Sequence, residues 1–117
     1  MSEDLCLMPA TALRDLIARR DVSPVVVTKA VLQRAQRLQP ERNCFITLCA
    51  DEALQEAREA ERALMAGAPL GIPYTCKDIV NTRGVRTTFG SRLFEANVPA
   101  EDALAVARMR RHGAILI

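Results

Sequence analysis

Apolar residues recur at helical spacing in four parts of the chain. The four predicted helices cover residues 9–20, 24–40, 51–66 and 101–111. The second has the clearest limits, because Ser23 suits the N-cap, Pro24 suits the first helical position, and Pro40 is expected to end it. Gly67 and Gly113 follow the third and fourth stripes and predict the C-terminal ends of those helices.

The apolar stripes also predict which side chains face the core. These are Leu13, Leu16 and Ile17 in the first helix, Val27, Val31, Leu32, Ala35 and Leu38 in the second, Ala53, Ala57, Ala60 and Leu64 in the third, and Ala105, Val106 and Met109 in the fourth. The core is therefore expected to consist of aliphatic side chains, since the chain has only three Phe and one Tyr.

Three shorter segments have the apolar, partly β-branched composition of strands. They are "NCFITLC" at 43–49, "LGIPYTCKDIV" at 70–80 and "AILI" at 114–117. Residues 81–84, "NTRG", predict a turn, and residues 85–91, "VRTTFGS", predict an extended segment that ends in a loop. Helices and strands then alternate over most of the chain, which predicts an α/β fold with helices packed around an incomplete mixed sheet.

The apolar run at residues 114–117 bears on domain organisation. A buried parallel strand needs neighbouring strands and helices over both faces, so at the end of a domain this run would be an exposed hydrophobic edge. We therefore expect residues 1–117 to be the N-terminal portion of a larger domain, truncated after Ile117.

Composition excludes several classes of function. A length of 117 residues allows one domain at most, and a net charge of +2 is too weak to indicate direct binding to nucleic acid or to a membrane. Cys6, Cys44, Cys49 and Cys76 form no C-x-x-C pair, and His112 is distant from them in sequence, so we expect reduced, buried thiols, no metal and no cofactor. His112 and the arginines near it are expected to form a solvated basic helix end. No signal peptide is recognisable, which predicts a cytoplasmic location.

Lys77 is the residue with the clearest chemical potential. It is one of two lysines, the other being Lys29, in a chain that otherwise uses arginine as its cation. An arginine cannot lose its proton in a protein, whereas a lysine can act as a general base once it is neutral. On a regular strand, Pro73, Thr75 and Lys77 would share one face. A surface lysine at the end of a strand is the alternative interpretation.

The stretch "GIPYTCKDIVNTRGVRTTFGSRLFEANVPAEDALAVARMRRHGAILI" resembles the amidase signature family. It carries a Gly-Ile-Pro run, a Lys followed by Asp, a Gly-centred turn, Thr-Thr-x-Gly-Ser, and a Gly-Ala pair before an apolar strand. The preceding residues match the N-terminal helices of that family more loosely. The resemblance implies an amide hydrolase with a Ser–cis-Ser–Lys triad in which Lys77 is the catalytic lysine and base.

The resemblance also implies that both catalytic serines lie beyond Ile117. Of the three serines in the chain, Ser2 is terminal and Ser23 is a helix cap. Ser91, with Thr87 and Thr88, is interpreted as a loop residue that shapes the site, because it lacks the Gly-x-Ser-x-Gly context of a nucleophile. The chain alone is therefore expected to be inactive.

Two alternatives to a stand-alone amidase follow. One is a fragment of a glutamyl-tRNA amidotransferase A-type subunit, and the other is a non-catalytic interaction module. The resemblance implies a small-molecule amide as substrate, and either homo-oligomers or amidotransferase partner subunits as the assembly. The substrate-binding residues are not identified by sequence.

Overall fold

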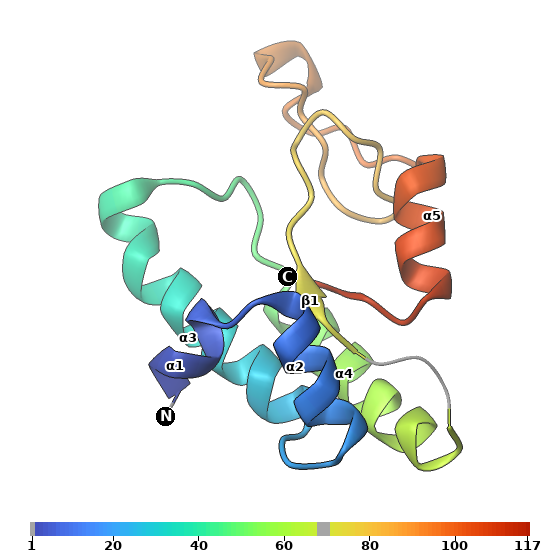
Figure 1. The fold of residues 1–117 in the computed structure, drawn as a ribbon. Helices are drawn as coiled ribbons and strands as arrows, with labels where there is room; N and C mark the ends of the chain where they lie inside the picture. The colour runs from blue at the N-terminus through green and yellow to red at the C-terminus, as the bar shows by residue number, and fades with distance from the viewer. Residues whose placement is uncertain (1, 68–70) are drawn as a thin grey trace.

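Four helices form the body of the molecule. The computed structural model describes residues 2–67 and 71–117. The helices are α1 (Ser2–Leu7), which the apolar pattern does not predict, α2 (Ala10–Ala18), α3 (Pro24–Arg42) and α4 (Ala50–Met65). The long helix α3 packs against α1 and α4 and lies between them (Figure 1). One buried cluster joins α1, α2 and α3 through Leu5, Leu13, Ile17, Val27 and Ala30.

Helix α3 begins as the sequence predicts but ends later. The Ser23 hydroxyl accepts a hydrogen bond of 3.2 Å from the Val26 N–H, and Pro24 is the first helical residue. Pro40 does not end the helix, which continues to Arg42. A proline so close to the C-terminus removes only one helical hydrogen bond. The helix ends instead at Asn43, whose left-handed backbone (φ 45°) allows its N–H to bind the Gln39 carbonyl.

The segment between α3 and α4 is not a strand, contrary to the prediction for residues 43–49. The Gln39 side chain binds its backbone in place of a sheet. The amide of Gln39 donates to the Phe45 carbonyl at 2.8 Å and accepts from the Phe45 N–H at 3.1 Å. The composition of the segment is strand-like, but the Gln39 side chain already binds the N–H and carbonyl of Phe45, which a sheet would otherwise use.

A short parallel sheet lies across α4. It consists of β1 (Pro73–Tyr74) and β2 (Ile115–Leu116), with Pro73 opposite Ile115 and Tyr74 opposite Leu116. The strand predicted for residues 70–80 is therefore wrong beyond Tyr74, and residue 70 lies outside the described residues. The α/β fold class is confirmed on a smaller sheet than the sequence indicates.

The apolar side chains of the strand at the C-terminal end are already buried within residues 1–117. Ile115, Leu116 and Ile117 are 1%, 6% and 6% exposed. Ile115 and Ile117 pack with the small side chains of Ala53 and Ala57 on α4. These two alanines are fully buried, so the helix can approach the strand closely.

Helix α5 (Leu104–Arg111) brings the chain back to β2 after an irregular excursion that includes a 3-10 turn, η1 (Arg92–Phe94). Figure 1 shows this excursion extending beyond β1, away from α1 and α2. Val106 of α5 is buried as predicted, but Ala105 and Met109 are exposed. Gly113, with φ 76°, ends the helix as expected.

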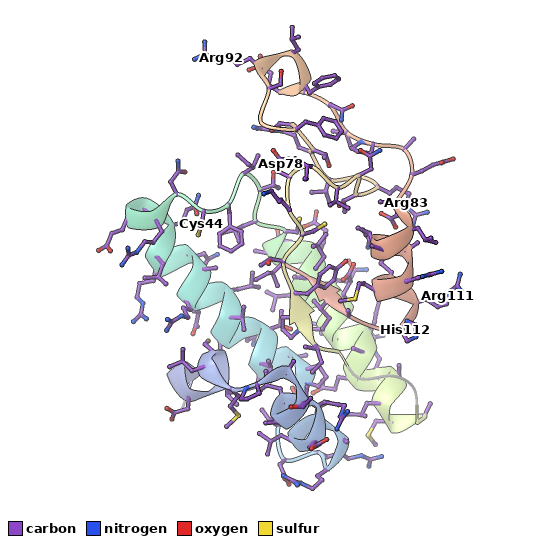
Figure 2. The ribbon with its side chains drawn as sticks, turned by 45° about the horizontal axis from the view of Figure 1, so that its top comes forward. Cys44, Asp78, Arg83, Arg92, Arg111 and His112 are labelled. Carbon is purple, nitrogen blue, oxygen red and sulfur yellow. The ribbon has the colours of Figure 1, made fainter. Side chains whose placement is uncertain are left out.

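One side chain of α5 connects three parts of the chain. Nη1 of Arg110 lies 3.1 Å from a carboxylate oxygen of Glu56 on α4, and its Nε lies 2.9 Å from Asp102, though without hydrogen-bond geometry. Asp102 also accepts a hydrogen bond of 2.7 Å from the Arg83 N–H. Arg110 is thus half-buried, whereas Arg111 and His112 are exposed and point outward (Figure 2). The expected solvated basic end is correct for these two residues and for Arg108, which is also exposed, but not for Arg110.

Gly71 lies where α3, α4 and β2 converge. A Cβ atom at this position would lie 2.7 Å from the Ala60 Cβ and 2.8 Å from the Ile115 Cδ1. Neither neighbour can move far, since both belong to packed elements. The glycine before Ile72 in the "GIP" run therefore has a steric reason: the chain entering β1 passes over α4 with no room for a side chain.

We predict that Gly71→Ala lowers the free energy of unfolding by about 1–3 kcal/mol, because it forces overpacking at this convergence. The matched control is Gly84→Asn, since Gly84 has open space around it and a φ of 76° that Asn tolerates. Urea unfolding of the 117-residue chain measures both. An equal loss in the two variants would contradict the steric role of Gly71.

Candidate active site

A cavity of about 240 Å³ lies at the carboxyl end of the two strands. Its walls come from three parts of the chain: residues 44–49 before α4, residues 75–87 after β1, and Leu116 and Ile117 at the end of β2. Ligands of parallel sheets bind outside the carboxyl ends of the strands. The tertiary structure therefore places the cavity where a site is expected in an α/β fold.

Lys77 lines this cavity, three residues after β1 ends. Its side chain is exposed, and its carbonyl accepts a hydrogen bond of 3.0 Å from the Val80 N–H, so Lys77 begins a turn and does not continue a strand. Exposure still alternates along residues 75–80, as on a strand, with Thr75 and Lys77 exposed. The predicted sharing of one face by these two side chains thus fits their exposure, although the sheet pairing stops at Tyr74.

Asp78 connects the turn that begins at Lys77 to the loop that contains Thr88. The Asp78 carboxylate accepts hydrogen bonds from the Thr88 hydroxyl and, at 2.7 Å, from the Thr88 N–H. The Asp78 carbonyl accepts a third from the Phe89 N–H, at 2.9 Å. Sequence reasoning treated Asp78 only as part of the motif. The one signal available was its position next to Lys77.

Hydrogen bonding outweighs burial at the Asp78 carboxyl. Burial by itself raises its pKa, but the hydroxyl and amide of Thr88 and the amide of Gly90 favour the charged form, as does the nearby Arg86 guanidinium. The net effect is a pKa below the ordinary value of 3.8. Asp78 is therefore a carboxylate throughout the neutral range, which is the form that accepts all these bonds.

Three threonines that follow the Lys77 turn, Thr82, Thr87 and Thr88, are buried and hydrogen-bonded. Thr87 donates its hydroxyl to the Val85 carbonyl at 3.1 Å, and Thr82 donates to the Val80 carbonyl at 3.2 Å. They stabilise the loop walls beside Thr88. Thr82 and Thr87 line the cavity, and Thr88 does not.

Ser91 caps a turn and does not face Lys77 across the cavity. Its Oγ accepts a hydrogen bond of 3.3 Å from the Leu93 N–H at the start of η1, and it is not among the residues that line the cavity. Figure 2 shows Arg92, the next residue, at the far tip of the excursion. The interpretation of Ser91 as a loop residue agrees with this position.

Three of the four cysteines line the same cavity, which sequence spacing did not indicate. They are Cys44, Cys49 and Cys76, and all are free thiols. The expectation of buried thiols is correct only for Cys49, since Cys44 is exposed and Cys76 is half-buried. Burial raises the pKa of the Cys49 thiol, and the carboxylates of Glu52 and Glu56 raise it further. Cys44 lies at the start of the loop after α3 (Figure 2).

Among the described residues, no group of three or more His, Cys, Asp and Glu side chains could hold a metal ion. Within the same residues, none of the helices combines the length and apolar character needed to span a bilayer.

Asp78 accepts hydrogen bonds from Thr88 and Phe89, and these contacts, which we call the Asp78 clamp, predict a specific pH dependence of stability. Because the folded chain holds the Asp78 carboxyl at a lower pKa than the unfolded chain does, its ionised form stabilises the fold above about pH 4. This contribution is lost as the pH falls through the folded-state pKa. Asp78→Asn should therefore lower the Tm at pH 6, and the difference between the two proteins should shrink as the pH falls below the ordinary carboxyl range. A Tm difference independent of pH would contradict this assignment.

The cavity thiols should differ in reactivity. At pH 7 a maleimide should label Cys44 more than about tenfold faster than Cys49, because burial and a raised pKa both suppress the Cys49 thiolate. Peptide mass spectrometry measures the two rates in one sample. In denaturant the two rates should become similar, and a fast-reacting Cys49 in the native chain would show that this wall of the cavity is open.

Known proteins resemble this chain in sequence over most of its length. The family model described as Amidase matches residues 26–117. The A-type subunit of the glutamyl-tRNA(Gln) amidotransferase of Geotalea daltonii is 42% identical over 108 residues, which cover 90% of this chain and 22% of that protein. The corresponding protein of Dehalococcoides mccartyi is 37% identical over 117 residues, covering 97% of this chain and 24% of that protein.

Solved structures agree with the sequence relatives. Fatty acid amide hydrolase superposes with a TM-score of 0.90 at 27% identity, over 98% of this chain and 21% of that one. A bacterial aryl acylamidase of the amidase signature family gives a TM-score of 0.84 at 22% identity, over 94% of this chain and 24% of that one, which bears on the fold alone. The chain thus spans about a quarter or less of the proteins that it matches.

Proposed function

The chain belongs to the amidase signature family, and on that premise we propose that it supplies the catalytic lysine, Lys77, of an enzyme that cleaves amide carbon–nitrogen bonds other than peptide bonds. One observation carries the proposal. Lys77 lines the cavity at the carboxyl end of β1 and β2, within the segment that matches the family. The cytoplasm is its proposed location.

The chemistry of this role depends on lysine. In the proposed Ser–cis-Ser–Lys mechanism, the neutral amine of Lys77 accepts a proton from a serine, which relays it from a second serine as that serine attacks the amide carbonyl. The proton returns through the same serine to the leaving nitrogen as the carbon–nitrogen bond breaks, and water then hydrolyses the acyl-enzyme. An arginine could not accept that proton. We propose that both serines belong to residues outside this chain, because Ser23 and Ser91 both serve as caps here. The chain alone would then be inactive, as a base without its nucleophile.

The cavity walls favour a small-molecule amide as the substrate. Apolar side chains of Phe45, Ile46 and Val85 line the cavity together with the polar groups of Lys77 and Asp78. Such a mixture of an apolar wall with a few polar groups is typical of sites for small ligands. Residues of this chain enclose about 240 Å³ of the proposed site.

The second candidate function is that of an amidotransferase A-type subunit. The curated relatives described above carry that name, with up to 42% identity, which favours it at the level of sequence. In this case the chain would work with partner subunits on glutamyl-tRNA. The superposition on fatty acid amide hydrolase, at a TM-score of 0.90, favours a stand-alone amidase.

The test is a chimera in which this chain replaces the matching residues of the Geotalea daltonii relative. Amide hydrolysis by the chimera should fall by about 10²–10⁴-fold in kcat with Lys77→Ala, as for the loss of a general base. Lys77→Arg should be equally impaired, because the guanidinium keeps both charge and length but cannot accept a proton. Ammonia release from simple amides measures turnover.

Lys29→Ala is the matched control, since Lys29 is the other lysine of the chain and lies exposed on α3. It should leave turnover unchanged. A Lys77→Arg chimera with normal turnover would exclude Lys77 as the base. Turnover by the isolated 117-residue chain that is lost in Lys77→Ala would contradict the proposal that the chain is inactive alone.

A further inference from the structure

Sheet pairing does not hold Lys77 in place. The pairing of β1 with β2 ends at Tyr74, and the last interstrand bond joins the Ile117 N–H to the Tyr74 carbonyl at 3.1 Å. Lys77 lies beyond this point, exposed, in a turn closed by a single bond between its carbonyl and the Val80 N–H. A base must be held in one place relative to its partner groups, so some other contact has to fix this turn.

Asp78 makes that contact with three hydrogen bonds to the loop at Thr88 and Phe89. The Thr88 side of this clamp is itself ordered, because its hydroxyl also accepts the Gly90 N–H at 3.2 Å. A carboxylate can only accept, so the hydroxyl donates to Asp78 and keeps a lone pair for Gly90. Thr88 is 5% exposed, so water competes little for these bonds.

The loop that receives Asp78 is hydrogen-bonded on its other side to the backbone and side chain of Asn97. The Thr87 N–H donates to the Asn97 carbonyl at 2.9 Å, and the Asn97 side chain donates back to the Thr87 carbonyl at 2.8 Å. Phe89 has a left-handed backbone with φ 55°, which a bulky residue adopts only where its surroundings determine it. The bond from the Phe89 N–H to the Asp78 carbonyl is one such determinant.

We propose that Asp78 is a positioning residue, which binds Thr88 and thereby fixes the turn that directs Lys77 into the cavity. The inference rests on the proposed role of Lys77 as the base. We assign Asp78 no part in proton transfer, because its carboxylate is directed at the N–H and hydroxyl of Thr88. Its part is to convert a flexible turn into a fixed one.

Amide hydrogen exchange in the 117-residue chain tests the clamp directly. Asp78→Asn and Thr88→Val each remove a charge-assisted hydrogen bond, so exchange of the Val80 amide should become about tenfold faster. Thr88→Ser keeps the hydroxyl and should restore the original rate. The amides of Ile115 and Ile117, which bind the carbonyls of Ile72 and Tyr74, should accelerate clearly less than the Val80 amide in Asp78→Asn and Thr88→Val, since they report only the global loss of stability.

Two exchange results would overturn the proposal. One is an unchanged Val80 rate in both Asp78→Asn and Thr88→Val. The other is an equal acceleration at Val80, Ile115 and Ile117, which would mean that the clamp serves only global stability.

Kinetics in the chimera provide the functional measurement. Thr88→Val should lower kcat by about tenfold with KM little changed, because a displaced base slows the chemical step, and Thr88→Ser should recover kcat. Full turnover of Thr88→Val in a chimera that depends on Lys77 would overturn the positioning role. A chimera whose turnover does not depend on Lys77 would instead contradict the proposed function, while the exchange result would still decide whether the clamp holds the turn.

Discussion

The close approach of the chain at Gly71 to α3, α4 and Ile115 is the constraint on which the rest of the structure depends. It allows the chain to pass close to Ala60 of α4 as it enters β1, and β1 then pairs with β2 near the C-terminus. The pairing then brings the residues after β1 next to Leu116 and Ile117. The cavity that contains Lys77 follows from this packing, because its walls are the segments that leave the two paired strands.

A polar network extends this packing to α5. Glu56 binds Arg110 with one carboxylate oxygen, and its other oxygen accepts a hydrogen bond of 3.4 Å from the Leu116 N–H, on the side of β2 away from β1. Burial raises the pKa of Glu56, although Arg110 opposes the shift. Breaking a pair of this kind leaves a partly buried charge without compensation. Arg110 therefore holds α5, α4 and the chain near Asp102 in one arrangement, and a solvated basic helix end could not do this.

The site combines two structural principles. Close packing of small side chains against a short sheet positions the cavity, and hydrogen bonds between loops shape its rim. The second contribution matters more for Lys77, since the lysine lies beyond the sheet. Asp78 binds Thr88 and Asn97 binds the neighbouring Thr87, so hydrogen bonds between loops fix irregular backbone that no sheet pairing holds. Under the proposed positioning role of Asp78, the residue that follows Lys77 serves to hold the turn in place.

The sequence alone determined the helices from α2 to α5, because apolar periodicity, the Ser23 cap and the C-terminal glycines are local signals. It also identified the family and indicated Lys77 as the candidate catalytic residue, because the motif is contiguous. Strand limits could not be predicted, because pairing depends on which distant backbone is available. "NCFITLC" has strand composition, but the Gln39 side chain binds its backbone. "TCKDIV" also has strand composition, but it forms a turn that the Val80 N–H closes on the Lys77 carbonyl. Only the tertiary structure brought Cys44, Cys49 and Cys76 to one cavity. It alone also paired Arg110 with Glu56 and Asp102 and hydrogen-bonded Asp78 to Thr88. Each of these depends on contacts between residues distant in sequence, which no local pattern encodes.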